Sequence, residues 1–85
     1  MNTKDIDYAL VGDCPICGQG RQFITKERHT DEYYVMCEDC ESEWVSPVEC
    51  DSINKVRREN HGPSDFVTLT SINLHSWKEH VKNLN

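Results

Sequence analysis

The chain has 85 residues, of which 36% are hydrophobic, and its mean hydropathy of −0.71 leaves little apolar material for a core. This length suits a single domain over residues 1–85, and a core this small rarely supplies more than about 3–5 kcal/mol, which predicts a stabilising metal ion or disulfides. Nine basic and fifteen acidic residues give a formal charge of −6, which repels phosphate backbones and attracts basic surfaces.

Residues 1–13 are expected to form an N-terminal tail that leads into the first cysteine pair. No apolar leader follows Met1 and no long apolar run occurs, so we expect neither a secretion signal nor a membrane span. A cytoplasmic, reducing compartment is therefore expected, in which paired cysteines bind metal rather than form disulfides. The total of five cysteines also leaves one over in any disulfide scheme.

Residues 14–46 are expected to form a three-stranded antiparallel zinc ribbon. Two Cys-x-x-Cys pairs, Cys14 with Cys17 and Cys37 with Cys40, are separated by nineteen residues. This spacing places four thiolates around one tetrahedral Zn²⁺, with a β-hairpin filling the gap. A site with four cysteine ligands keeps no open position for water or substrate, so the predicted zinc is structural rather than catalytic.

The residues around the cysteines predict the local structure of the ribbon. Gly18 accepts the positive φ of a zinc knuckle, whereas Glu41 stands at the equivalent position of the second knuckle. Residues 21–25 and 32–36 are rich in aromatic and β-branched side chains and predict two antiparallel strands joined by a charged turn. A third strand is predicted at residues 43–45.

Two helices are expected within a C-terminal segment over residues 47–85, so that the predicted fold class is small α+β. Ser46 and Glu49 form a capping box that predicts a first helix reaching Asn60. A second capping box begins at Ser76 and predicts a helix near the C-terminus. The apolar stripe of that helix comprises Trp77, Val81 and Leu84.

Other segments leave alternatives open. Residues 64–74 fit either a short strand or a short helix. Cys50 is expected to be a small buried helix residue, and a reactive thiol is disfavoured because Glu49 and Asp51 would raise its pKa. A redox role for the paired cysteines would need a Cys-x-x-Cys at a strand-to-helix junction, and neither pair has one. We therefore expect no enzyme activity.

Acidic and aromatic side chains in and after the hairpin are the candidate partner-binding residues. They are Asp31, Glu32, Tyr33, Glu38, Asp39, Glu41, Glu43 and Trp44. Their negative charge predicts a basic protein partner, reached through an acidic face. Stacking on single-stranded nucleic acid would need a basic groove beside the aromatic rings, so nucleic acid is not an expected ligand.

The two knuckles resemble those of the zinc-ribbon superfamily over residues 14–46. Asp31 and Glu32 also resemble the acidic pair in the zinc ribbon of transcript-cleavage elongation factors, where Asp and Glu help hold a catalytic metal in RNA polymerase. In that family the pair stands further from the second knuckle and the chain ends soon after it, whereas here Glu32 precedes Cys37 by five positions and a long segment follows. This likeness implies an alternative function as a transcription- or RNA-associated ribbon.

A wider likeness covers residues 14–84. It consists of Cys-Pro-x-Cys-Gly, a hairpin, Cys-x-x-Cys-x-x-Glu-Trp, a Ser-Pro helix start and a terminal helix that carries Trp. This pattern resembles small bacterial zinc-ribbon proteins, some of which are immunity proteins of polymorphic or contact-dependent toxin systems. The resemblance implies that the chain binds and neutralises a basic, nuclease-type toxin domain. Such toxins tend to be basic because they bind phosphates, and complementary charge gives fast association.

Overall fold

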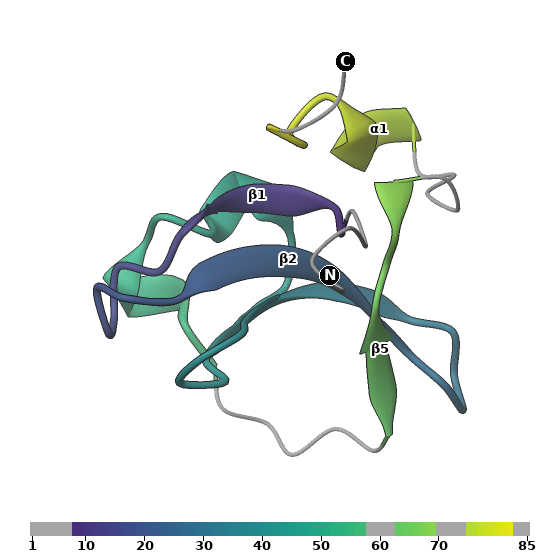
Figure 1. The fold of residues 1–85 in the computed structure, drawn as a ribbon, viewed down its shortest axis with the longest axis horizontal. Helices are drawn as coiled ribbons and strands as arrows, with labels where there is room; N and C mark the ends of the chain where they lie inside the picture. Colours follow the sequence, from purple (N-terminus) through teal and green to yellow (C-terminus); the bar gives the residue numbers. More distant parts are fainter. Residues whose placement is uncertain (1–7, 58–62, 70–74, 83–85) are drawn as a thin grey trace, which may run out of the picture.

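A five-stranded antiparallel sheet dominates the computed structural model, which describes residues 8–57, 63–69 and 75–82 (Figure 1). The strands are β1 (Leu10–Asp13), β2 (Arg21–Glu27), β3 (Tyr33–Cys37), β4 (Glu43–Trp44) and β5 (Ser64–Phe66). Short helical elements accompany them, namely the 3₁₀ turns η2 (Pro47–Glu49) and η3 (Ile53–Lys55) and the α-helix α1 (His75–Lys78). Within the described residues, none of the helices has the length and apolar character needed to cross a membrane.

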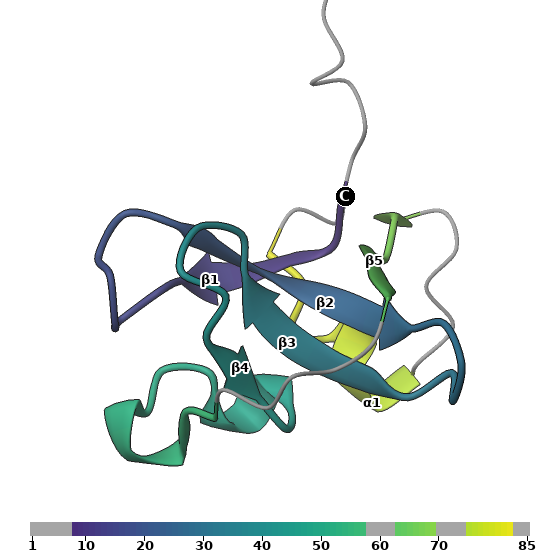
Figure 2. The ribbon, with the colours of Figure 1, turned by 90° about the horizontal axis from the view of Figure 1, so that it is seen from below.

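β2 is the central strand of the sheet. β3 pairs with one edge of β2, in a register that runs from Gln22 opposite Cys37 to Lys26 opposite Tyr33. The other edge of β2 is shared, because β1 pairs with its first half and β5 with its second half (Figure 2). β4 then extends the sheet beyond β3. The three strands predicted from the ribbon pattern are thus present as β2, β3 and β4, and two further strands join them.

A ring of three backbone hydrogen bonds joins β1, β2 and the end of β5. The amide of Ala9 donates to the carbonyl of Val67 (2.8 Å), Val67 donates to Ile24 (2.8 Å), and Ile24 donates to Ala9 (3.0 Å). All three residues are buried. Buried backbone groups need hydrogen-bond partners. This ring supplies them where the pairing along one edge of β2 passes from β1 to β5.

The apolar core lies against the sheet and includes part of the cysteine cluster. Its buried members are Ala9, Val11, Cys14, Ile24, Val35, Cys37, Trp44, Val67 and Val81. α1 and the turn after it lie against the sheet (Figure 1), where Trp77 meets Tyr33 edge-on at a centroid distance of 6.2 Å. The metal-binding end and the apolar core are therefore one continuous packing unit.

The prediction of a small α+β fold with two C-terminal helices is wrong. Instead of a helix from Pro47, the chain forms η2 and η3, and Arg57 then pairs with Glu43 as an extended bridge. The Ser46 side chain makes no capping hydrogen bond. Residues 58–60, which the predicted helix also included, lie outside the described residues.

Side chains from the sheet explain why residues 47–57 do not form an α-helix. Gln22 Nε2 donates to the carbonyl of Cys50 (2.5 Å), and Trp44 Nε1 donates to the carbonyl of Ser52 (3.0 Å). An α-helix would give these carbonyls to the amides four residues later. The segment is also rich in β-branched and small polar residues, whose helix propensity is low, so tertiary hydrogen bonds override the capping signal.

The C-terminal helix is much shorter than predicted. After α1, the amides of His80 and Val81 donate to carbonyls three residues earlier, which tightens the chain into a turn. The amide of Lys82 then donates to the carbonyl of Leu10 in β1 (2.7 Å). The chain therefore leaves the helix to join the edge of the sheet. Leu84, the last residue of the predicted stripe, lies outside the described residues.

Two other segments can now be assigned. Within residues 64–74, the strand alternative holds for β5, while residues 70–74 lie outside the described residues. The expected N-terminal tail contributes β1 to the sheet, and its residues 1–7 are likewise not described. Both added strands pair with β2, which is why the short ribbon pattern alone does not reveal them.

Trp44→Phe should lower the free energy of unfolding by about 2 kcal/mol, because it removes a hydrogen bond to Ser52 and leaves a cavity at a fully buried site. Trp77→Phe is the matched control, since Trp77 is only half-buried, and it should cost less than about 1 kcal/mol. Urea unfolding of both variants measures the difference. Equal costs would contradict the proposed role of Trp44.

Candidate metal centre

Two loops bring the four predicted ligands together at one end of the sheet. Cys14 and Cys17 lie between β1 and β2, and Cys37 and Cys40 lie at the end of β3 and in the turn after it. The pairing of Gln22 with Cys37 places these loops side by side. All four sulfur atoms lie within 4.8 Å of one another, and the Cys14–Cys40 and Cys17–Cys37 sulfur pairs are each 3.7 Å apart.

The sulfur cluster fits a single tetrahedral metal ion. A tetrahedral site with metal–sulfur bonds of about 2.3 Å has sulfur atoms about 3.8 Å apart, close to the spacing observed here. None of the four cysteines forms a disulfide. Thiolate sets of this geometry are typical of Zn²⁺ and of iron. The four side chains are therefore positioned to hold a metal ion through sulfur alone.

Backbone amides in both knuckles point at the sulfur atoms. Four such amides donate to Cys14, Cys17 and Cys37 sulfurs at 3.3–3.4 Å. Hydrogen bonds of this kind stabilise a thiolate and hold its orientation, as outer-shell contacts do in metal sites generally. The donors are the amides of Ile16, Gly20, Asp39 and Cys40.

The four thiols differ in how readily they lose a proton. Burial raises the pKa of Cys37 to about 12 and also raises the pKa of Cys14. Backbone hydrogen bonds lower the pKa of Cys17. At Cys40, burial alone would raise the pKa, but hydrogen bonds with Ser42 and the neighbouring thiols outweigh it and bring the pKa to about 6. A metal ion must displace protons from the two buried thiols, so metal affinity should fall as the pH falls.

Both knuckles turn through a residue in the left-handed region. Gly18 has φ of 71° and Glu41 has φ of 63°. Glutamate therefore adopts the conformation that glycine takes in the first knuckle, and the departure from the usual pattern does not change the turn. The Cβ atom makes this conformation unfavourable by roughly 1–2 kcal/mol for residues other than glycine. The second knuckle thus stores backbone strain at an exposed carboxylate.

Gly20 is a site residue that sequence reasoning missed. A Cβ atom at this position would lie 2.5 Å from the sulfur of Cys37 and 2.6 Å from the Cβ of Asp39. The first loop can pass this closely under the second knuckle only because Gly20 has no side chain. Nothing local in the sequence signals this requirement, because the crowding comes from residues that follow much later in the chain.

Some candidate partner-binding residues are not available at the surface. Trp44 is 0% exposed and Glu43 is 5% exposed. Tyr33 is half-buried beside Trp77. We therefore leave Glu43 and Trp44 out of any interaction surface, because a partner could not reach them without unfolding the sheet.

The exposed acidic residues among the partner-binding candidates fall into two groups at opposite ends of the hairpin. Asp31 and Glu32 lie in the turn between β2 and β3, and Glu38, Asp39 and Glu41 belong to the second knuckle. The five residues of β3 separate these groups by roughly 16 Å at about 3.3 Å per residue. The predicted acidic face is therefore divided into two patches rather than one.

Ion pairs within the chain further reduce the acidic surface. Arg21 Nε lies 2.9 Å from a carboxylate oxygen of Glu38, and Lys26 Nζ lies 3.5 Å from Asp31. Among the residues that the structure describes, no ion pair reaches Asp39 or Glu41. The second knuckle therefore presents two carboxylates whose charge is not already compensated.

The aromatic side chains of the hairpin do not form an open stacking platform. Phe23 is buried, and its ring packs against Tyr8 and Phe66 at centroid distances of 5.8 and 5.1 Å. Tyr34 is buried and its hydroxyl donates to Ser64 Oγ. The Trp44 indole in β4 also lies inside the core. The structure therefore gives no support for base stacking on this hairpin.

Comparison with known proteins adds no assignment: no family model matches the sequence, and neither a curated protein nor a solved structure shows significant similarity to the chain. The functional argument therefore rests on the residues themselves.

Gly20→Ala should weaken metal binding and lower the free energy of unfolding by about 2 kcal/mol, because the new methyl group would overlap Cys37 and Asp39. Gly18→Ala is the matched control: the space around it is open, so only the strain of its positive φ remains, which is about 1 kcal/mol. Chelator competition and urea unfolding report both quantities. A smaller effect at position 20 than at position 18 would refute the crowding argument.

Proposed function

We propose that the chain is a non-catalytic zinc-binding module that binds a basic protein partner. The metal is one structural Zn²⁺ held by Cys14, Cys17, Cys37 and Cys40. Its role is to fix the two knuckle loops, because a closed set of four thiolates offers no coordination site for a substrate. The sulfur spacing, the thiol-only donor set and the amide hydrogen bonds support this assignment.

The observation that carries the binding proposal is the conformation of Glu41. Among the described residues other than glycine, positive φ angles occur at Asp31 (62°) and Glu41 (63°), and both side chains are exposed. Aspartate tolerates this region, but glutamate does so at a cost. Strain that is kept at an exposed side chain points to a function for that side chain. The carboxylates of Glu41 and Asp39 are therefore proposed as the partner-binding charges.

The overall charge supports a basic partner. The chain carries −6, and four thiolates with one Zn²⁺ add two more negative charges. Complementary charge accelerates the encounter of two proteins and disfavours phosphate-bearing ligands. Within this proposal the partner is a nuclease-type toxin domain, as the resemblance to zinc-ribbon immunity proteins implies, and the chain acts by occupying the toxin's phosphate-binding surface.

The alternative of a transcription-associated ribbon has less support. Its acidic pair would be Asp31 and Glu32, and Asp31 already pairs with Lys26. The two functions place the partner-binding charges at opposite ends of the hairpin. Variants that remove the same charge from each end therefore distinguish the two functions.

The test begins with capture of the partner from the cell's own lysate on the zinc-loaded chain, followed by titration with two variants. Asp39→Asn/Glu41→Gly removes both knuckle charges and should weaken binding at least about tenfold. The same double variant should be more stable by about 1 kcal/mol, because Glu41→Gly relieves the positive-φ strain. Lost binding together with gained stability cannot be attributed to unfolding.

Asp31→Asn/Glu32→Gln is the control, since it removes the same charge from the other end of the hairpin and should change the affinity less than threefold. Protection of cells from the captured protein would support the immunity function. Capture of RNA polymerase subunits or RNA, or a loss of binding that follows the Asp31 and Glu32 changes instead, would reject the proposal in favour of the transcription-type ribbon.

A further inference from the structure

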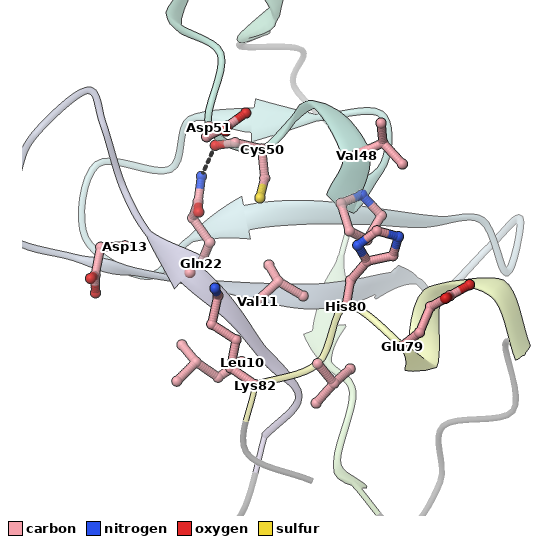
Figure 3. Close-up of a pocket in the computed structure, with 13 residues that line it drawn as sticks. Leu10, Val11, Asp13, Gln22, Val48, Cys50, Asp51, Glu79, His80 and Lys82 are labelled. Carbon is pink, nitrogen blue, oxygen red and sulfur yellow. Dashed lines mark hydrogen bonds between the residues drawn. The ribbon is translucent and has the colours of Figure 1, made fainter.

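An open cavity of about 760 Å³ lies between β1, η2 and the C-terminal turn (Figure 3). We call it the β1 groove. Leu10 and Val48 provide its accessible apolar surface, since 71% of Val48 is exposed, and the buried Val11 and Val81 also line it. Its volume lies within the range of roughly 300–1,000 Å³ that is typical of binding pockets. Neither the metal centre nor the charges of the second knuckle account for this feature.

The charged residues of the β1 groove are mainly acidic. Asp13, Asp51 and Glu79 are exposed and lie around it, and Lys82 contributes the opposing ammonium group (Figure 3). In the described part of the chain, none of these three carboxylates takes part in an ion pair. The groove therefore combines an apolar lining with a net negative charge, which is complementary to an apolar side chain flanked by lysine or arginine.

Hydrogen bonds across the walls hold the groove open in a defined shape. The buried side chain of Gln22 donates to the carbonyl of Cys50, which ties η2 to the sheet. The amide of Lys82 donates to the carbonyl of Leu10, which ties the C-terminal turn to β1. A groove whose walls are already ordered loses less conformational entropy on binding.

The position of the groove connects it to the metal centre. Asp13 lines the groove and directly precedes the ligand Cys14. A partner seated in the groove would therefore lie at the knuckle end of the sheet. A second copy of this chain would bring a further charge of −6 to an acidic surface, so self-association is disfavoured.

We propose that the β1 groove anchors a segment of the basic protein partner, with an apolar side chain against Leu10 and Val48 and a neighbouring lysine or arginine beside Asp51 and Glu79. This inference rests on the proposed function and adds the apolar anchor to it. The knuckle carboxylates supply long-range attraction, and the groove supplies the short-range contact that slows dissociation.

The first test uses three synthetic peptides as probes of the metal-loaded full chain: Ac-Lys-Leu-Lys-Leu-Lys-amide, its Lys-Ser-Lys-Ser-Lys analogue and its Glu-Leu-Glu-Leu-Glu analogue. Amide shifts in a two-dimensional NMR titration should move at Leu10 and Val48 with the first peptide only. Equal shifts with the serine peptide would mean attraction by charge alone. That result, like shifts confined to the knuckles or no binding of the leucine–lysine peptide, would overturn the inference.

Charge reversal at the groove provides the second test. Asp51→Lys/Glu79→Lys changes two exposed residues and should weaken binding of the leucine–lysine peptide about tenfold or more. Asp31→Lys/Glu32→Lys makes the same change in net charge at the opposite end of the hairpin and should alter the affinity less than threefold. Equal weakening by both double variants would contradict the groove as the site.

The affinity of the captured partner for two double variants then distinguishes this inference from the proposed function. If its affinity falls with Asp39→Asn/Glu41→Gly but not with Asp51→Lys/Glu79→Lys, the groove inference fails and the proposed function stands. If neither double variant changes the affinity, both fail. A loss with both variants supports the two-part interface, with the groove variant raising the dissociation rate.

Discussion

The contact of four sulfur atoms at one end of a hairpin is the constraint on which the rest of this structure depends. Two of the sulfur-bearing residues, Cys14 and Cys37, are also buried members of the apolar core. Four thiolates at this spacing repel one another, so a cation is needed before the core can close around them. The metal and the core are therefore coupled: neither the knuckle loops nor the small apolar cluster is expected to hold its shape alone.

The parts of the structure that sequence reasoning predicts are those whose information is local. The cysteine spacing gives the sulfur cluster, and the runs of aromatic and β-branched residues give β2 and β3. The helix predictions are wrong because residues distant in the sequence determine the conformation of these segments. A capping box at Ser46 cannot reveal that Gln22 and Trp44 will bind the carbonyls that a helix needs.

The same distinction applies to the candidate site. The ligand set follows from spacing, whereas the need for Gly20 arises from contact with Cys37 and has no local signal. The partner-binding residues were predicted by residue type, and type alone does not separate the buried Trp44 and Glu43 from the exposed Asp39 and Glu41. Burial and ion pairing decide which charges remain for a partner, and both are properties of the folded sheet.

The most direct test of this account is the effect of metal removal on the fold. Zinc content and a two-dimensional amide NMR spectrum should be measured on the purified chain before and after treatment with a strong chelator, and again after zinc is restored. The account predicts one zinc per chain, collapse of the dispersed β-sheet signals in the metal-free chain, and their return with one equivalent of zinc. A metal-free chain that keeps the same dispersed spectrum would contradict the dependence of the fold on the four-cysteine site.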